Sequence, residues 1–219
     1  MFGSLWQWLF VGISPDQMVN ENDDIDSIST LIKITQEREL FEKISRAKRD
    51  FIHIFSLVGN SIAYDKIEDI HGPHKGIKIS QGNELQSCPY QVLDIVRDFD
   101  LNTGLNIRVL YWWGRGAYLL VFYGTNHPLL ANQSKLFKWL KVKSFDLCNT
   151  GLWDYQGIID QKKIISNNSL TLELMKNHLE GELSFQIIKP ISFENYNSLH
   201  YKLIAEWEEL YAFHLENKI

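Results

Sequence analysis

The chain has 219 residues, with 22 Lys and Arg against 27 Asp and Glu, and its formal net charge is −5. Hydrophobic residues make up 45% of it and aromatic residues 13%, a content that excludes an intrinsically disordered protein. The acidic balance argues against a nucleic-acid coat, which needs a basic surface. Cys88 and Cys148 are too few for a disulfide framework. We expect both thiols to be reduced and buried, and the protein to be cytoplasmic.

Residues 1–13 are apolar and rich in Trp. They lack the basic start and cleavage site of a signal peptide, and they are shorter than the roughly 20 residues of a transmembrane helix. Their spacing predicts a helix that packs on the domain or on a partner chain, including a second copy, with a membrane-surface anchor as the alternative. The acidic run 20–24 predicts a loop. We therefore expect an N-terminal segment over 1–25 and a single domain over 26–219.

Apolar residues recur at intervals of three and four from about 27 to 63, which predicts one or two helices. Shorter helices are predicted over 134–142 and 170–179. The last helix is expected from about 192 to 216, with Ser192 as its N-cap. Its predicted buried stripe consists of Tyr196, Leu199, Leu203, Trp207, Leu210 and possibly His214.

The clearest strands are 106–113 and 117–123, which are rich in β-branched and aromatic residues. The short connection Gly114-Arg115-Gly116 predicts that they form an antiparallel hairpin. Arg108 alternates with apolar neighbours and should point to the opposite face of the sheet.

The remaining strands are expected on both sides of this hairpin. Residues 66–90 are predicted to be irregular apart from a strand over 76–80. The pattern of 90–99 fits a strand or a helix, and the preceding proline and the β-branched content favour an extended conformation at its start. Residues 182–189 are predicted to be a strand that Pro190 ends. The order of elements predicts an α+β fold: a mostly antiparallel sheet with helices packed on one face, plus the apolar N-terminal helix.

Six short motifs lie between about 75 and 124, less than a quarter of the chain. They are KGIKIS (75–80), LQ (85–86), PYQVLD (89–94), RDFD (97–100), GLNIRVL (104–110) and WWGRG (112–116). Together they resemble a family of uncharacterised bacterial proteins. The resemblance implies a shared core and assigns no catalytic residue.

Asp94, Arg97, Asp98 and Arg108 form the first candidate cluster. If the segment after residue 94 is extended, the two aspartates share a face and Arg97 takes the other. Arg108 needs a carboxylate partner, because an unpaired buried charge is costly. The cluster could be a structural network, an anion-binding pocket that uses a guanidinium fork, or an acid–base pair of aspartates.

Trp112, Trp113 and Arg115 form the second candidate cluster. Adjacent strand residues face opposite ways, so at most one tryptophan should point inward. The other could pack under a lid or stack on a base or sugar beside Arg115.

The histidine pair His71 and His74 is a weak candidate for binding a metal, since no Cys-x-x-Cys or His-Glu-x-x-His motif supplies further ligands. We expect these two histidines to be exposed in a loop, and no cofactor. The other histidines are expected to be ordinary: His53, His127, His178, His200 and His214.

No nucleophile-elbow, Walker or dinucleotide-binding motif occurs in the chain. We therefore expect a non-enzymatic ligand-binding or protein-interaction module with a pocket for a small anion near Arg97, Arg108 and Trp113, and no role in nucleic-acid binding. The alternative is a small hydrolase that uses Asp94, Asp98 and His74. It requires His74 to lie within hydrogen-bond reach of an aspartate.

Overall fold

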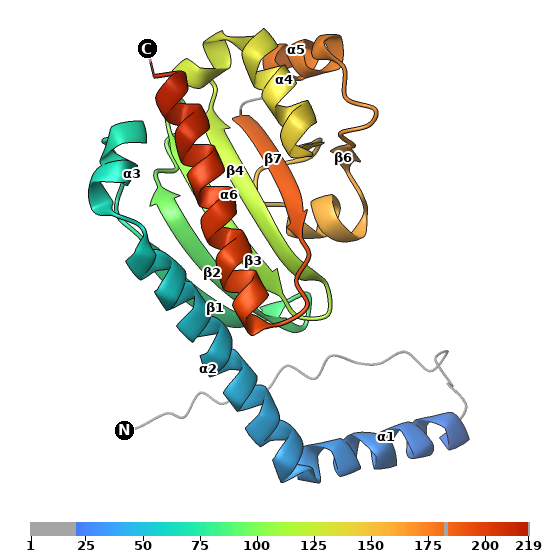
Figure 1. The fold of residues 1–219 in the computed structure, drawn as a ribbon. Coiled ribbons are helices and arrows are strands. Elements are labelled where there is room, and N and C mark those ends of the chain that lie inside the picture. Colours follow the sequence, from blue (N-terminus) through green and yellow to red (C-terminus); the bar gives the residue numbers. More distant parts are fainter. Residues whose placement is uncertain (1–20, 182–183, 219) are drawn as a thin grey trace, which may run out of the picture. The chain divides into compact units, whose positions relative to one another are not determined.

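The computed structural model describes residues 21–181 and 184–218 (Figure 1). The apolar helix predicted over 1–13 lies outside these residues. The chain divides after Ala47 into two compact units, an N-terminal unit and a second unit that begins at Lys48. No helix among the described residues has the length and apolar character needed to cross a membrane.

The described part of the N-terminal unit is helical. Its helices are α1 (Glu21–Gln36) and the first part of α2 (Arg38–Ser61), which confirms the helices predicted over 27–63. The acidic run 20–24 was expected to be a loop, and this prediction is wrong, since α1 begins at Glu21. Acidic residues are favourable in the first turn of a helix because they complement the partial positive charge of its N-terminus.

A seven-stranded sheet in the order β1-β2-β3-β4-β7-β5-β6 forms the centre of the second unit. Every pairing in it is antiparallel, which confirms the predicted α+β class and the hairpin. The strands are β1 (Lys78–Leu85), β2 (Cys88–Arg97), β3 (Leu105–Trp112), β4 (Gly116–Gly124), β5 (Asp146–Cys148), β6 (Ile164–Ile165) and β7 (Ser184–Ile191).

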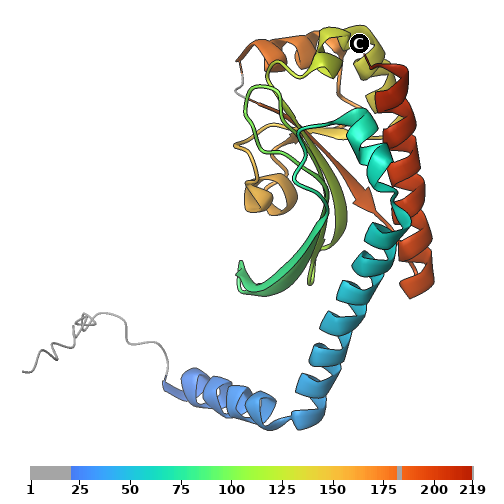
Figure 2. The same ribbon diagram turned by 90° about the vertical axis from the view of Figure 1, so that its left-hand side faces the viewer.

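One face of the sheet, the helix face, carries the main core. Figures 1 and 2 show α6 lying along this face. Each α-helix of the unit contributes buried side chains to that core, among them Phe55, Ile67, Leu136, Met175 and Trp207. The helices are the second part of α2, α3 (Tyr64–Ile70), α4 (Gln133–Lys143), α5 (Leu172–Gly181) and α6 (Tyr196–Glu216), with the short 3-10 helix η1 (Pro128–Ala131) before α4.

The opposite face of the sheet is covered by residues 150–161, which we call the cover segment. It contains a short π-helix, η2 (Gln156–Asp160), drawn on the far side of the sheet from α6 in Figure 2. Ile158 and Ile159 of η2 belong to a smaller core with Leu110 and Trp112 of β3. The sheet is therefore buried on both faces over β3, and this explains why β3 and β4 are so apolar.

Three local predictions are corrected by the structure. The region 66–90 is more regular than predicted, because it holds most of α3 and all of β1. Pro190 does not end its strand but pairs with Tyr118 inside β7. Proline is tolerated there because β5 pairs with β7 only at Ile187 and Ile188, so one side of Pro190 has no strand to which it must donate.

The third correction concerns the start of α6. Its N-cap is Asn195 and not Ser192. The Asn195 side chain accepts the backbone N–H of Ser198 at 3.0 Å, and the Ser198 hydroxyl accepts the N–H of Asn195 at 3.1 Å. This reciprocal capping box satisfies two N–H groups at once, which a single serine cap does not. The predicted buried stripe of α6 is otherwise confirmed, from Leu199 to His214.

Two loops at one end of the sheet are held together by backbone hydrogen bonds. The N–H of Gly124 donates to the carbonyl of Gly104 at 2.8 Å, and the N–H of Asn126 donates to that of Asn102 at 2.7 Å. A Cβ atom on Gly104 would lie 2.4 Å from the carbonyl oxygen of Asp100, so only glycine fits there.

Gly104→Ala should lower the free energy of unfolding by about 1–3 kcal/mol, because the loop backbone must move to admit the methyl group. Gly151→Ala is the control, since a Cβ at Gly151 meets no atom within 4 Å. Chemical denaturation of the two variants measures the difference. Equal stabilities would show that the Gly104 loop adapts freely.

Candidate functional site

The guanidinium group of Arg108 is fully engaged inside the protein. Its Nε and Nη2 atoms donate to the two carboxylate oxygens of Asp94 at 2.7 and 3.1 Å, and Nη1 donates to the hydroxyl of Tyr155 at 2.6 Å. The side chains of Arg108 and Asp94 are only 15% and 4% exposed. The Trp153 ring of the cover segment lies 4.4 Å from the guanidinium carbon. The predicted partnership of Arg108 with an aspartate is confirmed.

Asp94 also keeps Arg108 charged. Burial by itself lowers the pKa of Arg108 and is the largest single effect, but the hydrogen bonds and charge interactions with Asp94 and Tyr155 together outweigh it and raise the pKa above its usual value. Asn106 donates a further hydrogen bond to Asp94 at 3.1 Å. The cluster is therefore neutralised within itself and presents no free fork to an anion.

Arg97 does not take part in the network of Arg108 and Asp94, although the sequence placed all three in one candidate cluster. The Nη2 atom of Arg97 donates to the carbonyl oxygen of Lys75 at 2.6 Å. The expectation that Asp94 and Asp98 share a face also fails, because a register shift between Asp94 and Val96 interrupts the alternation of β2. Ile95 and Val96 both join the helix-face core as a result.

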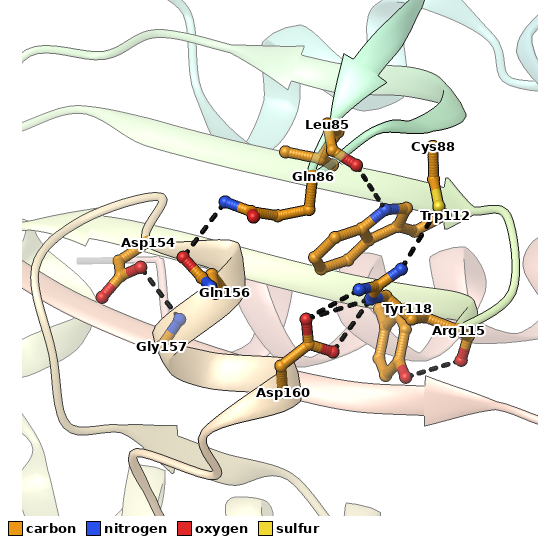
Figure 3. Close-up of polar contacts among 10 residues, drawn as sticks. All are labelled: Leu85, Gln86, Cys88, Trp112, Arg115, Tyr118, Asp154, Gln156, Gly157 and Asp160. Atoms are coloured by element: carbon orange, nitrogen blue, oxygen red, sulfur yellow. Dashed lines mark hydrogen bonds and ion pairs between the residues drawn. The ribbon is translucent and has the colours of Figure 1, made fainter. Parts of the chain in front are cut away.

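The two tryptophans of the hairpin face opposite ways, as predicted. Trp112 is fully buried on the covered face, while Trp113 is half-buried and donates to the side-chain oxygen of Gln91 at 2.8 Å. Arg115 lies over the Trp112 ring, 4.1 Å from its centroid (Figure 3). Neither the buried ring of Trp112 nor the face against Arg115 is open to a base or sugar.

Arg115 connects the hairpin to the cover segment. Its Nε donates to Asp160 at 2.8 Å, and its Nη1 lies 3.4 Å from the sulfur of Cys88 (Figure 3). The hydrogen bond from Gln86 to Gln156, 3.0 Å long, adds a second connection to η2. Both cysteines are free thiols, but only Cys148 is buried and Cys88 is half-buried. Arg115 is thus occupied in holding the cover segment.

A cavity of about 280 Å³ lies away from these arginines, among segments that are distant in the sequence. The end of α3 and the loop after it supply residues 70–73, the turn before η1 supplies 127–129, and the end of α6 supplies His214, Asn217 and Lys218. Thr103 adds a hydroxyl from the loop after β2. We call this the histidine cavity, because His71, His127 and His214 all line it.

His71 is paired with Asp98 at this cavity. Its Nε2 atom lies 2.8 Å from Oδ2 of Asp98, and the two residues are 8% and 9% exposed. The other carboxylate oxygen of Asp98 accepts the N–H of Asp100 at 3.2 Å. The carboxylate only accepts, so Nε2 carries the proton of the neutral ring. In that tautomer Nδ1 is the acceptor nitrogen, and it has no hydrogen-bond partner within the described chain.

The prediction that His71 and His74 are exposed is wrong, since both are buried. Nδ1 of His74 accepts the N–H of Gly76 at 3.0 Å, and its ring packs beside Tyr64. His71, and not His74, is the histidine that reaches an aspartate. The sequence lacks a signal for this choice, because Asp98 lies 27 positions away.

His214 is held as a neutral imidazole inside the core. Its Nδ1 donates to the carbonyl oxygen of Leu210 at 2.7 Å, so its Nε2 accepts the hydroxyl of Tyr123 at 3.2 Å. Burial lowers the pKa of His214 to about 4, even though the bond to Leu210 acts in the opposite direction.

His127 is the opposite tautomer to His214, because its proton is on Nε2 and not on Nδ1. Its Nδ1 accepts the N–H of Leu129 at 3.3 Å, so Nε2 carries the proton and has no partner among the residues described. Burial, together with the neighbouring His214 and His71, lowers the pKa of His127 to about 3. Its ring centroid lies 6.0 Å from that of His71 and 6.4 Å from that of His214.

These histidines do not make a metal centre. Within residues 21–181 and 184–218, no group of three or more His, Cys, Asp or Glu side chains is arranged to hold a metal ion. Both nitrogens of His214 are already bonded, which leaves His71 and His127 with one uncommitted nitrogen each. These two nitrogens are the hydrogen-bonding positions that the cavity histidines leave open.

Comparison with known proteins does not assign the chain to a family. No family model matches the chain, and no curated protein and no solved structure matches it. The resemblance to uncharacterised bacterial proteins stays a prediction.

Arg108→Met should lower the free energy of unfolding by about 3–5 kcal/mol, because it leaves Asp94 buried without a counter-charge. Asp94→Asn in the same chain should restore part of that loss. Lys66→Met breaks the more exposed pair with Glu208 and serves as the control, with an expected effect of about 0.2–1 kcal/mol. Urea denaturation compares the three, and similar losses for Arg108→Met and Lys66→Met would contradict a buried network.

The free energy of unfolding should fall as the pH is lowered from 7 towards 4. The unfolded chain protonates His214 near its usual pKa of 6.5, whereas the folded chain resists protonation until about 4, so acid favours unfolding by about 3 kcal/mol through this residue.

The matched variant for this test is His214→Gln. It should be less stable than the wild type at pH 7. The difference in the free energy of unfolding between the two proteins should become smaller as the pH falls. His127 and the His71–Asp98 pair also face this region and remain in both proteins, so the difference isolates His214. Denaturation at several pH values measures this difference, and a constant difference would rule out a buried neutral His214.

Proposed function

We propose that this protein is a ligand-binding domain whose ligand, a short aliphatic carboxylate, occupies the histidine cavity. The observation that carries the proposal is the meeting of three histidines, distant in the sequence, at one cavity. His71 is hydrogen-bonded to Asp98 behind the cavity wall, and Nδ1 of His71 and Nε2 of His127 have no partner among the described residues. Two nitrogens without a protein partner at a cavity are positions that a ligand can hydrogen-bond, as the few polar groups of ligand pockets do.

The apolar part of the lining favours an aliphatic body. Ile70, Pro73, Pro128 and Leu129 line the cavity. A volume of about 280 Å³ is at the small end of ligand pockets, which run from about 300 to 1,000 Å³. A short chain of a few carbons suits this size and polarity.

The polar part of the lining favours a carboxylate on that body. Nε2–H of His127 donates and cannot accept, and the basic residue Lys218 is among the lining residues of the same cavity. His71 can donate from Nδ1 when it is protonated. These donors complement the two oxygens of a carboxylate.

The expected anion pocket near Arg97, Arg108 and Trp113 is less favourable, because Arg108 is bonded to Asp94 and Tyr155. The proposal keeps the predicted class, a module that binds a small anion, and moves the site to the histidines. Binding of a protein partner, association through residues 1–13 and a cytoplasmic location stay predictions.

Binding of butyrate, followed by nuclear magnetic resonance, tests the proposal. Butyrate should shift the imidazole signals of His71 and His127 in a saturable way. Gly72→Leu should abolish these shifts, because Gly72 lines the cavity and a Cβ there meets no atom within 4 Å, so the new side chain enters open space without disturbing the fold.

Gly151→Leu is the matched control, since Gly151 has equally free surroundings and lies in the cover segment. It should bind butyrate as the wild type does. Shifts that do not saturate, or that persist in Gly72→Leu, would refute the proposed site.

A further inference from the structure

We infer that the histidine cavity is also a hydrolytic site, in which His71, positioned by Asp98, acts as a general base that activates water against a short-chain carboxylic ester. The inference rests on the proposed function, because the carboxylate that the cavity binds would be the product of this reaction. The geometry that carries it is the hydrogen bond of 2.8 Å between His71 and Asp98 at the cavity wall.

The pairing gives His71 the properties of a base. Oδ2 of Asp98 holds the proton on Nε2, so the lone pair of Nδ1 is available. The carboxylate also stabilises the imidazolium ion that forms when Nδ1 takes a proton. Asp98 is itself held by the N–H of Asp100 and lies directly after β2, on a rigid sheet. Asp98 is therefore a positioning residue and His71 the catalytic one.

The reaction balances with water as the only co-reactant. Nδ1 of His71 removes a proton from a water molecule while the water oxygen forms a bond to the carbonyl carbon of the ester. The carbonyl electron pair moves to its oxygen and then returns, which breaks the bond to the alcohol oxygen. The leaving oxygen takes the proton back from Nδ1. The products are the alcohol and the carboxylic acid, which ionises.

His127 suits the role of donor to the carbonyl oxygen. Its Nδ1 is committed to Leu129, so Nε2–H points its proton away from that bond and is free for the substrate. Its ring lies 6.0 Å from that of His71, close enough for one ester and one water to contact both. Because burial keeps His127 neutral, it donates a hydrogen bond without competing for the proton that His71 removes.

Water is the nucleophile that the lining allows. No serine or cysteine is among the described residues that line the cavity, and the hydroxyl of Thr103 is directed to Asp100 at 3.3 Å. The free thiols Cys88 and Cys148 belong to the covered face of the sheet. A covalent intermediate on a side-chain oxygen or sulfur is therefore not part of this reaction.

Hydrolysis of p-nitrophenyl butyrate by the full chain tests the inference. The wild type should hydrolyse it with a kcat/KM at least about 100-fold above that of His71→Gln, a factor typical of general-base catalysis. Asp98→Asn should lower kcat with little change in KM. Gly72→Leu should be inactive because it fills the cavity. His53→Gln, at an exposed histidine of α2, is the matched control and should keep the wild-type rate.

Chemical rescue separates catalysis from a structural role. Imidazole added to His71→Ala should restore hydrolysis in a saturable way, above the rate of imidazole alone, because it occupies the space of the deleted ring. The same additive should have no effect on Gly72→Leu. Circular dichroism of each variant establishes that it is folded, and Gly72→Leu keeps the test decisive if substitution of His71 unfolds the chain.

Several outcomes would overturn the inference. They are a wild-type rate equal to that of His71→Gln or Gly72→Leu, a folded His71→Ala variant that imidazole does not rescue, and a burst of p-nitrophenolate that shows attack by a side chain. If butyrate binds as described above but no ester is hydrolysed, the binding function stands and only the catalysis fails. If butyrate does not bind, both fail.

Discussion

The hydrogen bond between His71 and Asp98 is the contact on which the site depends. It joins the residue that ends α3 to the residue that follows β2, two positions that the chain separates by 26 residues of loop and sheet. The bond sets the tautomer of His71 and leaves its second nitrogen at the cavity. The same loop is also attached to β2 by hydrogen bonds between Lys75 and Arg97, so the histidine–aspartate pair is one of several contacts that hold this wall of the cavity.

Polar groups on the covered face of the sheet and polar groups at the histidine cavity differ in how far they are paired. On the covered face, Arg108 is bonded to Asp94 and Tyr155, and Arg115 is bonded to Asp160. Each charge there meets its partner inside the protein, so the cluster stabilises the cover segment. At the histidine cavity, Nδ1 of His71 and Nε2 of His127 have no hydrogen-bond partner among the described residues. These two nitrogens beside a cavity are the reason for proposing the function there.

Local patterns predicted the elements well where one force dominated. The hairpin of β3 and β4 followed from β-branched residues and a glycine turn, and Arg108 needed a carboxylate because its neighbours were buried. Prediction failed where two signals competed. A β-bulge after Asp94 broke the alternation that would have kept Asp94 and Asp98 together, and the capping box at Asn195 displaced the simpler cap at Ser192.

The sequence by itself determined the class of fold, the hairpin and the need of Arg108 for an acidic partner, because these depend on periodicity and on the cost of burying a charge. Only the tertiary structure decided which acid pairs with which base. His71, His127 and His214 come from three separate elements, and their meeting depends on how α3, the turn before η1 and the end of α6 pack around the sheet. No spacing within the chain encodes that packing, so the sequence did not indicate that His127 and His214, expected to be ordinary, line one cavity with His71.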